Sequence, residues 1–472
     1  MITRWIDRLA ALAVRLDAAS GRGAYQAGVI ARAWALMKFV LLAPLFPLGS
    51  SLVAWRAAVN HERAKRTMDG LGDELATITA GGAPQGTFAR IERLDATEPV
   101  VITSDLHRCI SGRLDFVGQQ DNSALYVAML EWYADAGFGL IENGDIEDYW
   151  MVGGSTWGAL YDVLRLTGAA VVGRLGDPIR RATYRNHLER IIANNAPTYR
   201  VIRERFASAG RYHRTVGNHD DIYGDDRMAA VLSDLVGGVS VVDWIALDGP
   251  DGSEAIITHG HFADGWNAPG RATLGKLSSW VADIVRDIPG PPSPDDLPSP
   301  RSTRTLLSGR RSNSLLRVDA TFGANSSYDS LDEELLFDAA GGANERAAWF
   351  LMGHTHFPVF EPLSHSGARW WRYVNSGNGL GAGMITAIEW AGGDGPREPR
   401  LVAWCWGDRD EWRDTLDGFE PVSRDGARPV YRVGLVPSAD GRTLIADRSA
   451  AGLAAGLRRS ASPVSTRPPA AP

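Results

Sequence analysis

The sequence predicts an α/β protein built in layers. From about residue 99 onward, short apolar, β-branched runs typical of buried strands alternate with longer helical stretches. The chain has 472 residues, 44% of them hydrophobic, so it can bury a large core. Polar motifs rich in Asp, His and Asn directly follow five of the expected strands. Together these observations favour one large α/β domain with a functional site at its strand ends.

Residues 1–80 are expected to form a helical N-terminal region, in which Ala, Leu and Arg are abundant. A signal peptide is not predicted, because no apolar run there precedes a small-residue cleavage site. Residues 33–55 are apolar and almost uncharged, but Pro44 and Pro47 would break a spanning helix. Two interpretations stay open: a helical hairpin packed on the domain, or peripheral membrane contact through residues 33–55.

The main domain is expected to span residues 95–395, and its first buried strand is predicted at residues 100–102. Asp121 is expected to cap a helix that runs to about Ala136. The residues that this helix would bury are Leu125, Met129, Leu130 and Tyr133.

A long helical pattern covers residues 177–209, with a break expected at Pro197. Further strands are predicted at residues 138–141, 212–216, 255–258 and 349–352. This alternation is what predicts the layered arrangement.

Three segments lie outside the alternation. Residues 265–345 are rich in Pro and longer than a crossover needs, so a lid or insertion is expected there. Residues 396–449 are expected to form a C-terminal extension. Residues 450–472, mainly Ala, Ser, Arg and Pro, are predicted to be a disordered tail.

The charge balance and the cysteines restrict the partners and the compartment. Lys and Arg total 49 against 56 Asp and Glu, a net charge of -7, which argues against nucleic acid as the main partner. Cys109 and Cys405 are the two cysteines and are far apart, so neither a disulfide framework nor Cys-ligated zinc is expected. A cytoplasmic location is predicted, with membrane association through the N-terminal region left open.

Five motifs carry the residues suited to chemistry. They are Ser104-Asp105-Leu106-His107, Asn143-Gly144-Asp145-Ile146-Glu147-Asp148, Gly217-Asn218-His219-Asp220, Thr258-His259-Gly260-His261 and Gly353-His354-Thr355-His356. Each follows an expected strand, where α/β sheets place ligands because loops and helix N-termini converge there.

The motifs supply a set of metal ligands. Carboxylates and neutral imidazoles bind Mn, Fe and Zn ions, and one carboxylate can bridge two ions. The first and last motifs each hold two such residues spaced by two, so in an extended strand end both side chains of a pair would point the same way. The seven expected ligands are Asp105, His107, Asp145, Asn218, His259, His354 and His356. That number suffices for two divalent metal ions (Mn, Fe or Zn) that share a bridge.

In order and spacing the motifs resemble the calcineurin-like metallophosphoesterase superfamily over roughly residues 99–389. The resemblance implies a layered β-sandwich flanked by helices. It also implies hydrolysis of a phosphoric ester or diphosphate bond by a hydroxide held between two cations. The ligands implied for the first metal are Asp105, His107, Asp145 and His356, and those for the second are Asp145, Asn218, His259 and His354.

The same resemblance assigns His219 as the catalytic histidine near the leaving group, oriented by Asp148. Residues 374–377 look like the family's strand-to-turn element after the fifth motif. Five of the chain's ten histidines thus fall on positions assigned to metal binding or catalysis, which argues against a chance arrangement.

The chain departs from the phosphoprotein phosphatases of this superfamily. They have Arg-Gly after the last Asp of the second motif and Glu after the histidine of the third, where this chain has Tyr149-Trp150 and Asp220. Residues 144–150 and 259–264 look more like the UDP-2,3-diacylglucosamine pyrophosphatase branch, whose bacterial, membrane-associated members cut a diphosphate in a lipid precursor. A small-molecule or lipid-linked phosphate is therefore the expected substrate.

Several neighbouring residues have two interpretations. Arg108 is either a phosphate contact or a solvated surface charge. His261 and Asp264 either orient a ligand or contact substrate. Three further histidines are expected to be structural, with His187 and His213 on a helix and a strand and His365 in a turn.

Other functions stay open from the sequence alone. A phosphomonoesterase or a cyclic-nucleotide phosphodiesterase would use the same metals, because the motifs specify the metal chemistry and not the leaving group. A non-catalytic metal-binding scaffold and a membrane-tethered adaptor are the alternatives outside enzymes. The natural substrate and the oligomeric state are not specified.

Overall fold

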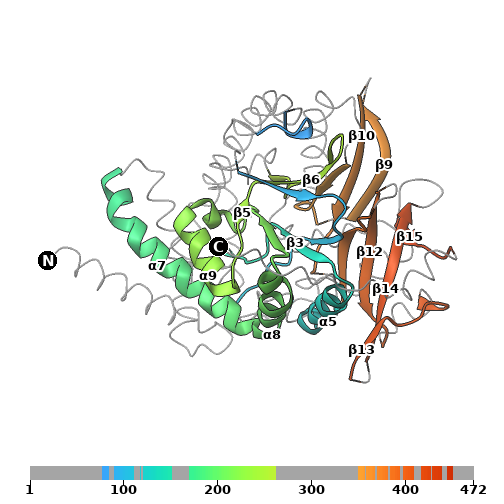
Figure 1. The fold of residues 1–472 in the computed structure, drawn as a ribbon. Coiled ribbons are helices and arrows are strands. Elements are labelled where there is room, and N and C mark those ends of the chain that lie inside the picture. The colour runs from blue at the N-terminus through green and yellow to red at the C-terminus, as the bar shows by residue number, and fades with distance from the viewer. Residues whose placement is uncertain are drawn as a thin grey trace, which may run out of the picture.

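The computed structural model of the chain is shown in Figure 1. The described residues are 77–83, 90–110, 117, 121–150, 170–261, 349–356, 358–366, 369–380, 383–393, 397–408, 416–426, 428–437 and 444–449. Several predicted features lie outside the described residues. They are almost all of the expected N-terminal helical region, including residues 33–55, the lid or insertion expected at 265–345, and the tail expected at 450–472.

The described strands form two mixed sheets. In spatial order, the six-stranded sheet contains β1 (Ile91–Asp95), β6 (Trp244–Gly249), β7 (Gly252–Ile257), β8 (Trp349–Met352), β10 (Arg369–Ser376) and β9 (Pro358–Ser366). The nine-stranded sheet contains β13 (Ser423–Asp425), β14 (Arg428–Pro437), β12 (Pro399–Trp406), β11 (Met384–Trp390), β2 (Val100–Thr103), β3 (Gly139–Asn143), β4 (Tyr212–Thr215) and β5 (Val241–Val242), with β15 (Leu444–Ala446) paired to β14. Within them, β2 to β5 run parallel, and β7 runs parallel to β8.

Strand β2 shows how the two sheets pack. Its residues are all buried, and alternate side chains enter different hydrophobic clusters. Ile102 joins a cluster that also contains Ile245 and Leu351 of the six-stranded sheet, so the two sheets face each other. Val101 points the other way, into a cluster shared with the helices. A strand buried on both faces is therefore apolar at every position, as the sequence predicted.

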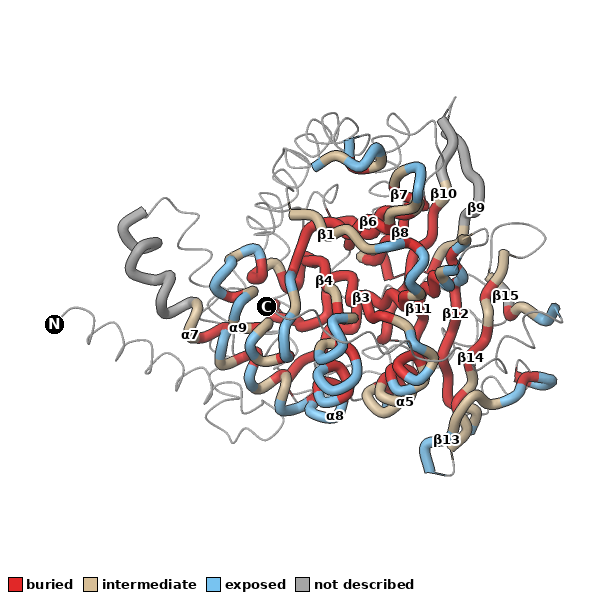
Figure 2. The backbone as a smooth tube through the Cα atoms, viewed as in Figure 1, coloured by how far each residue is buried: buried red, intermediate tan, exposed pale blue. Residues whose placement is uncertain are grey.

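The helices cover the outer face of the nine-stranded sheet (Figure 1). They are α5 (Asn122–Asp135), α7 (Ala170–Asn194), α8 (Ala196–Val201) and α9 (Asp226–Val236), with short turns at Ile202–Phe206, Ala207–Ala209 and Asp221–Gly224. Figure 2 shows buried strands at the centre and helices that expose one side to solvent. The layered α/β prediction is confirmed at this level.

Helix α5 confirms one expectation and corrects another. The four residues expected to be buried on it are all fully buried. Asp121 precedes the helix, but its side chain makes no capping hydrogen bond and its φ is 62°. The cap was predicted wrongly because the Asp121 carboxylate instead pairs with Arg428 beside β14.

The helical stretch after residue 170 breaks two residues earlier than predicted. Helix α7 ends at Asn194 and α8 begins at Ala196, with Asn195 between them. Pro197 lies in the first turn of α8, where proline's missing N–H needs no partner. Proline therefore starts the second helix here and does not end the first.

All five predicted strands are present, but the sheets extend beyond them. Strand β1 precedes the predicted start of the core, and β12 and β14, from the predicted C-terminal extension, pair into the nine-stranded sheet beside β11. His365 was expected in a turn, but it lies on β9 opposite Trp370 of β10. Two long antiparallel strands pair there.

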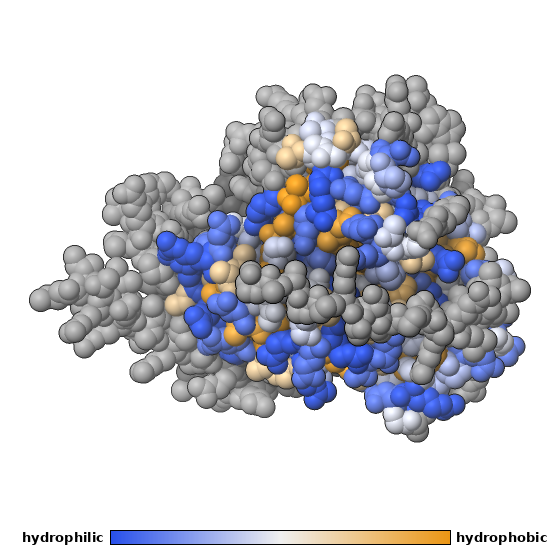
Figure 3. Space-filling view, in the orientation of Figure 1, coloured by the Kyte–Doolittle hydropathy of each residue, from blue (hydrophilic) through white to orange (hydrophobic). Residues whose placement is uncertain are grey.

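In the described part of the chain, no helix is long and apolar enough to cross a membrane. Cys109 and Cys405 are both buried and free. On the face in Figure 3, hydrophilic residues predominate along the lower edge, where α5 and α8 lie.

Candidate metal centre

The five motifs follow five strand ends, as predicted. Three of these ends, those of β2, β3 and β4, belong to the nine-stranded sheet, and the ends of β7 and β8 belong to the six-stranded sheet. Because both sheets direct these ends to one region, the motif side chains meet between the two layers.

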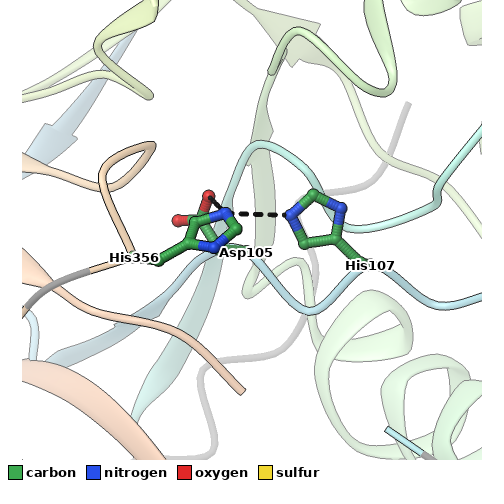
Figure 4. A group of neighbouring side chains, drawn as sticks. All are labelled: Asp105, His107 and His356. Atoms are coloured by element: carbon green, nitrogen blue, oxygen red, sulfur yellow. Dashed lines mark hydrogen bonds and ion pairs between the residues drawn. The ribbon is translucent and has the colours of Figure 1, made fainter. Parts of the chain in front are cut away.

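One group of side chains consists of Asp105, His107 and His356 (Figure 4). Nε2 of His356 lies 3.1 Å from Nε2 of His107 and 3.2 Å from Oδ1 of Asp105. All three residues are buried. Their ligand atoms lie within 4.8 Å of one another, a spacing that could hold one metal ion.

A second group consists of Asp145, His259 and His354. Nε2 of His259 lies 3.3 Å from Oδ2 of Asp145 and 3.2 Å from Oδ1 of Asn218. Asn218 therefore adds a neutral oxygen to this group, as the sequence predicted. The described part of the chain thus brings all seven expected ligands into two adjoining groups.

Asp145 joins the two groups. Its Oδ2 lies 3.8 Å from Nε2 of His107 and 3.3 Å from Nε2 of His259. Burial acts to raise the pKa of Asp145, but the nearby imidazoles of His259, His219 and His107 hold that pKa well below its usual value. An ionised carboxylate between two ligand groups is what a bridging ligand requires.

Five of the expected ligands have left-handed backbone. Their φ angles are 52° at Asp105, 45° at His107, 54° at Asp145, 70° at His354 and 60° at His356. In the described residues the only other non-glycine residue with positive φ is Asp121. Such clusters of strained backbone are typical of functional sites.

This backbone corrects the reasoning from strand periodicity. The paired ligands lie beyond the ends of β2 and β8 in left-handed turns, where the alternation of an extended strand does not hold. His354 and His356 accordingly enter different groups. The convergence of the seven expected ligands was predicted, but the extended backbone expected at the strand ends was wrong.

Local contacts explain why the loops adopt this shape. Asp105 N donates to Gly144 O at 3.1 Å, and His107 N donates to Asp145 O at 2.9 Å, so the first two motif loops are joined. A Cβ at Gly144, where φ is 76°, would lie 2.6 Å from the His259 ring. Glycine is required there because the second and fourth motifs touch.

The donor set fits a cation. Nδ1 of His259 lies 2.9 Å from the carbonyl oxygen of Asn143, which can only accept, so Nδ1 carries a proton, and Nε2, the nitrogen that could bind a cation, faces Asp145 and Asn218. Oδ1 of Asp105 is buried, and Nε2 of His356 lies 3.2 Å from it. Imidazole nitrogens and carboxylate oxygens grouped in this way are the donor types that divalent cations take.

His219 lies beside the first group and is held on two sides. Nδ1 of His219 lies 3.0 Å from Oδ2 of Asp148, and the Trp150 ring stacks on the imidazole at 4.3 Å between centroids. Burial acts to raise the pKa of Asp148, but His219 and hydrogen bonds from His107 and His219 hold that pKa below its usual value. The stacking of Trp150 was not predicted, although its place two residues after Asp148 was the available signal.

His261 lies at the rim of the second group. Its ring centroid is 5.3 Å from that of His259 and 6.2 Å from that of His354. Burial and the neighbouring histidines lower the pKa of His261 well below its usual value, so its imidazole is neutral at pH 7. Asp264 lies outside the described residues.

The strand-to-turn element at residues 374–377 supports the ligand loops. Nδ2 of Asn375 donates to the Gly353 carbonyl at 2.7 Å. The hydroxyl of Ser376 lies 2.6 Å from that of Ser104, which in turn contacts the Asp105 carboxylate. The element thereby connects the first and fifth motifs, a support that no residue pattern indicated.

The interpretation of Arg108 as a solvated surface charge was wrong. The side chain is 1% exposed, pairs with Glu142, and lies over the rings of Tyr126 and Tyr199 at 5.0 and 5.1 Å. Glu142 on β3 is fully buried and needs a counter-ion, which Arg108 supplies. Arg108 therefore belongs to the protein interior, and its contact with phosphate stays a prediction.

A second guanidinium lies in the same buried layer. Arg214 on β4 donates to the two carboxylate oxygens of Glu147 at 2.9 and 2.7 Å and to Asp220 at 3.1 Å. Burial raises the pKa of Asp220 to about 7 against the opposing effect of Arg214. The arginine–carboxylate network, as we call this set, comprises Arg108, Glu142, Glu147, Arg214 and Asp220. The network holds the loops of the second and third motifs in place through Glu147 and Asp220.

Comparison with known proteins gave no match, either to a family model or to a curated protein.

Proposed function

We propose that the chain is a binuclear metal-dependent phosphoesterase that hydrolyses a phosphoric ester or diphosphate bond. The observation that carries the proposal is the junction at Asp145, whose Oδ2 lies between the two ligand groups. The motif order, which resembles that of the calcineurin-like metallophosphoesterases, supports the same conclusion. Two divalent cations held there would lower the pKa of a bound water and neutralise phosphoryl oxygens.

The residues of the chain have separate tasks in this proposal. The seven ligands hold the cations. His219 presents Nε2 to the leaving oxygen, because its Nδ1 donates to Asp148. A protonated imidazole at that place neutralises the charge that develops on the leaving oxygen as the bond breaks. The ring packing of Trp150 keeps His219 in this orientation.

The first experiment measures hydrolysis of p-nitrophenyl phosphate, bis-p-nitrophenyl phosphate and nucleoside diphosphates under one metal condition. Protein treated with a chelator is expected to be inactive, and Mn²⁺ is expected to restore turnover. The preferred substrate then separates a monoesterase, a diesterase and a diphosphatase. Mn²⁺ binding without turnover on any of them would favour the non-catalytic metal-binding scaffold.

A further inference from the structure

The hydrogen bonds of Asp148 reach further than His219. Nδ1 of His107 and Nδ1 of His219 both lie 3.0 Å from the same atom, Oδ2 of Asp148. The two rings meet edge to face, with centroids 4.6 Å apart and an interplanar angle of 86°. One carboxylate oxygen thus contacts a residue of the first ligand group and the histidine beside it.

The main chain places Asp148 at this position. Asp148 N donates to the Arg108 carbonyl at 3.0 Å, and Tyr149 N donates to the His219 carbonyl at 3.3 Å. Trp150 N donates to the other carboxylate oxygen, Oδ1 of Asp148, at 2.8 Å. Asp148 is 1% exposed, so solvent does not replace these contacts.

We propose that Asp148 is a positioning residue for metal binding as well as for proton donation, an inference that rests on the proposed function. Accepting the Nδ1 proton of His107 leaves Nε2 of His107 unprotonated and directed at His356 and Asp145. Accepting the Nδ1 proton of His219 leaves its Nε2 for the leaving group. The two tasks share one oxygen atom.

An amide cannot replace this carboxylate. Oδ2 of Asp148 accepts from two imidazoles and Oδ1 accepts from Trp150 N. In Asp148→Asn, either orientation of the amide turns its NH₂ group towards a donor, and the negative charge beside the two rings is lost. Outer hydrogen-bond partners of metal-ligating histidines typically contribute 10- to 100-fold, roughly, to metal affinity.

The experiment titrates chelator-treated full-length protein with Mn²⁺ and follows binding by calorimetry, without any substrate. Asp148→Asn is expected to weaken binding of one Mn²⁺ by roughly 10- to 100-fold. His219→Ala and Trp150→Phe are matched controls, since they alter the same cluster but not His107, and they are expected to keep wild-type affinity. Wild-type Mn²⁺ affinity in Asp148→Asn would overturn the inference.

A second measurement protects the test if Asp148→Asn fails to fold. In the Zn²⁺-loaded wild-type protein, long-range ¹H–¹⁵N spectra of labelled histidines report which ring nitrogen carries the proton. His107 and His219 are both expected to be protonated at Nδ1, and a His107 protonated at Nε2 would refute the inference. Neither measurement uses hydrolysis, so a protein that binds metal as inferred but is inactive would contradict only the proposed function.

Discussion

Two buried charged regions of this molecule lie next to each other and differ in how their charges are balanced. In the arginine–carboxylate network, Glu142 and Glu147 each face a guanidinium from the chain itself. In the metal centre, the ion-pair partners of Asp105 and Asp145 are imidazole nitrogens. A guanidinium keeps its charge at any ordinary pH, whereas an imidazole that binds a metal must be neutral.

The comparison separates structural charge from functional charge. Each carboxylate of the network has a guanidinium of the chain as its partner, so the network can stabilise the neighbouring loops without a ligand. The candidate metal centre places its carboxylates beside imidazole nitrogens, which could together hold a cation. Substitutions in the two regions should therefore affect different measurements.

Asp145→Asn is expected to have the largest effect, because Asp145 contacts both ligand groups. The variant should lose both metal ions and fall to the background rate of hydrolysis. Elemental analysis of Mn-loaded protein and initial rates provide the measurement. Asp234→Asn, at an exposed position of α9, is the control and should bind close to two ions per chain. A fully loaded Asp145→Asn variant would remove the bridge from the proposal.

His219→Ala should separate chemistry from metal binding within the metal centre. Turnover is expected to fall by roughly 10²- to 10⁴-fold, the range for a lost general acid, while metal content stays near that of the wild type. The loss should be smaller for a nitrophenyl ester, because nitrophenolate needs less protonation as it leaves. Equal losses on activated and unactivated esters would argue against proton donation by His219.

Arg214→Met tests the network. Removing the guanidinium leaves Glu147 buried without its bidentate partner, so the free energy of unfolding should fall by about 3–5 kcal/mol. Urea denaturation of the metal-free protein measures this directly. A loss below about 1 kcal/mol would mean that the network is no more important than an ordinary surface pair.

Arg185→Ala provides the lower reference. Arg185 pairs with Glu189 one turn along α7, and their side chains are 59% and 48% exposed. Such pairs contribute about 0.3–0.5 kcal/mol, so the free energy of unfolding should fall by no more than that. The metal content should stay that of the wild type. Urea denaturation of Arg185→Ala and Arg214→Met under the same conditions shows whether burial accounts for the difference between their stability losses. If the two variants lost equal stability, burial would not be the cause.

Much of the site could be predicted from the sequence because its residues are polar groups placed directly after apolar strands. Strand β8 was predicted with its observed bounds, since its four residues are apolar and a glycine follows. The strands that were missed have weaker signals. Strand β5 has two residues, and β14 mixes Arg, Tyr and Gly with its apolar positions.

The environment of Arg108 could not be predicted for a different reason. Its counter-ion Glu142 lies 34 positions away, one residue beyond the strand predicted at residues 138–141, and the two meet only after β2 and β3 pair. The left-handed backbone of the ligands was equally hidden, because Asp and His do not mark positive φ as glycine does. Tertiary contacts determined both features.

The left-handed backbone of the expected ligands sets stability against metal binding. Each costs backbone energy that glycine would not, about 1 kcal/mol or more per position, and glycine differs from them only in lacking the side chain that reaches the centre. Replacing Asp105, His354 or His356 by glycine would relieve this strain and at the same time remove a side chain from the centre. Stability and metal binding would then change in opposite directions.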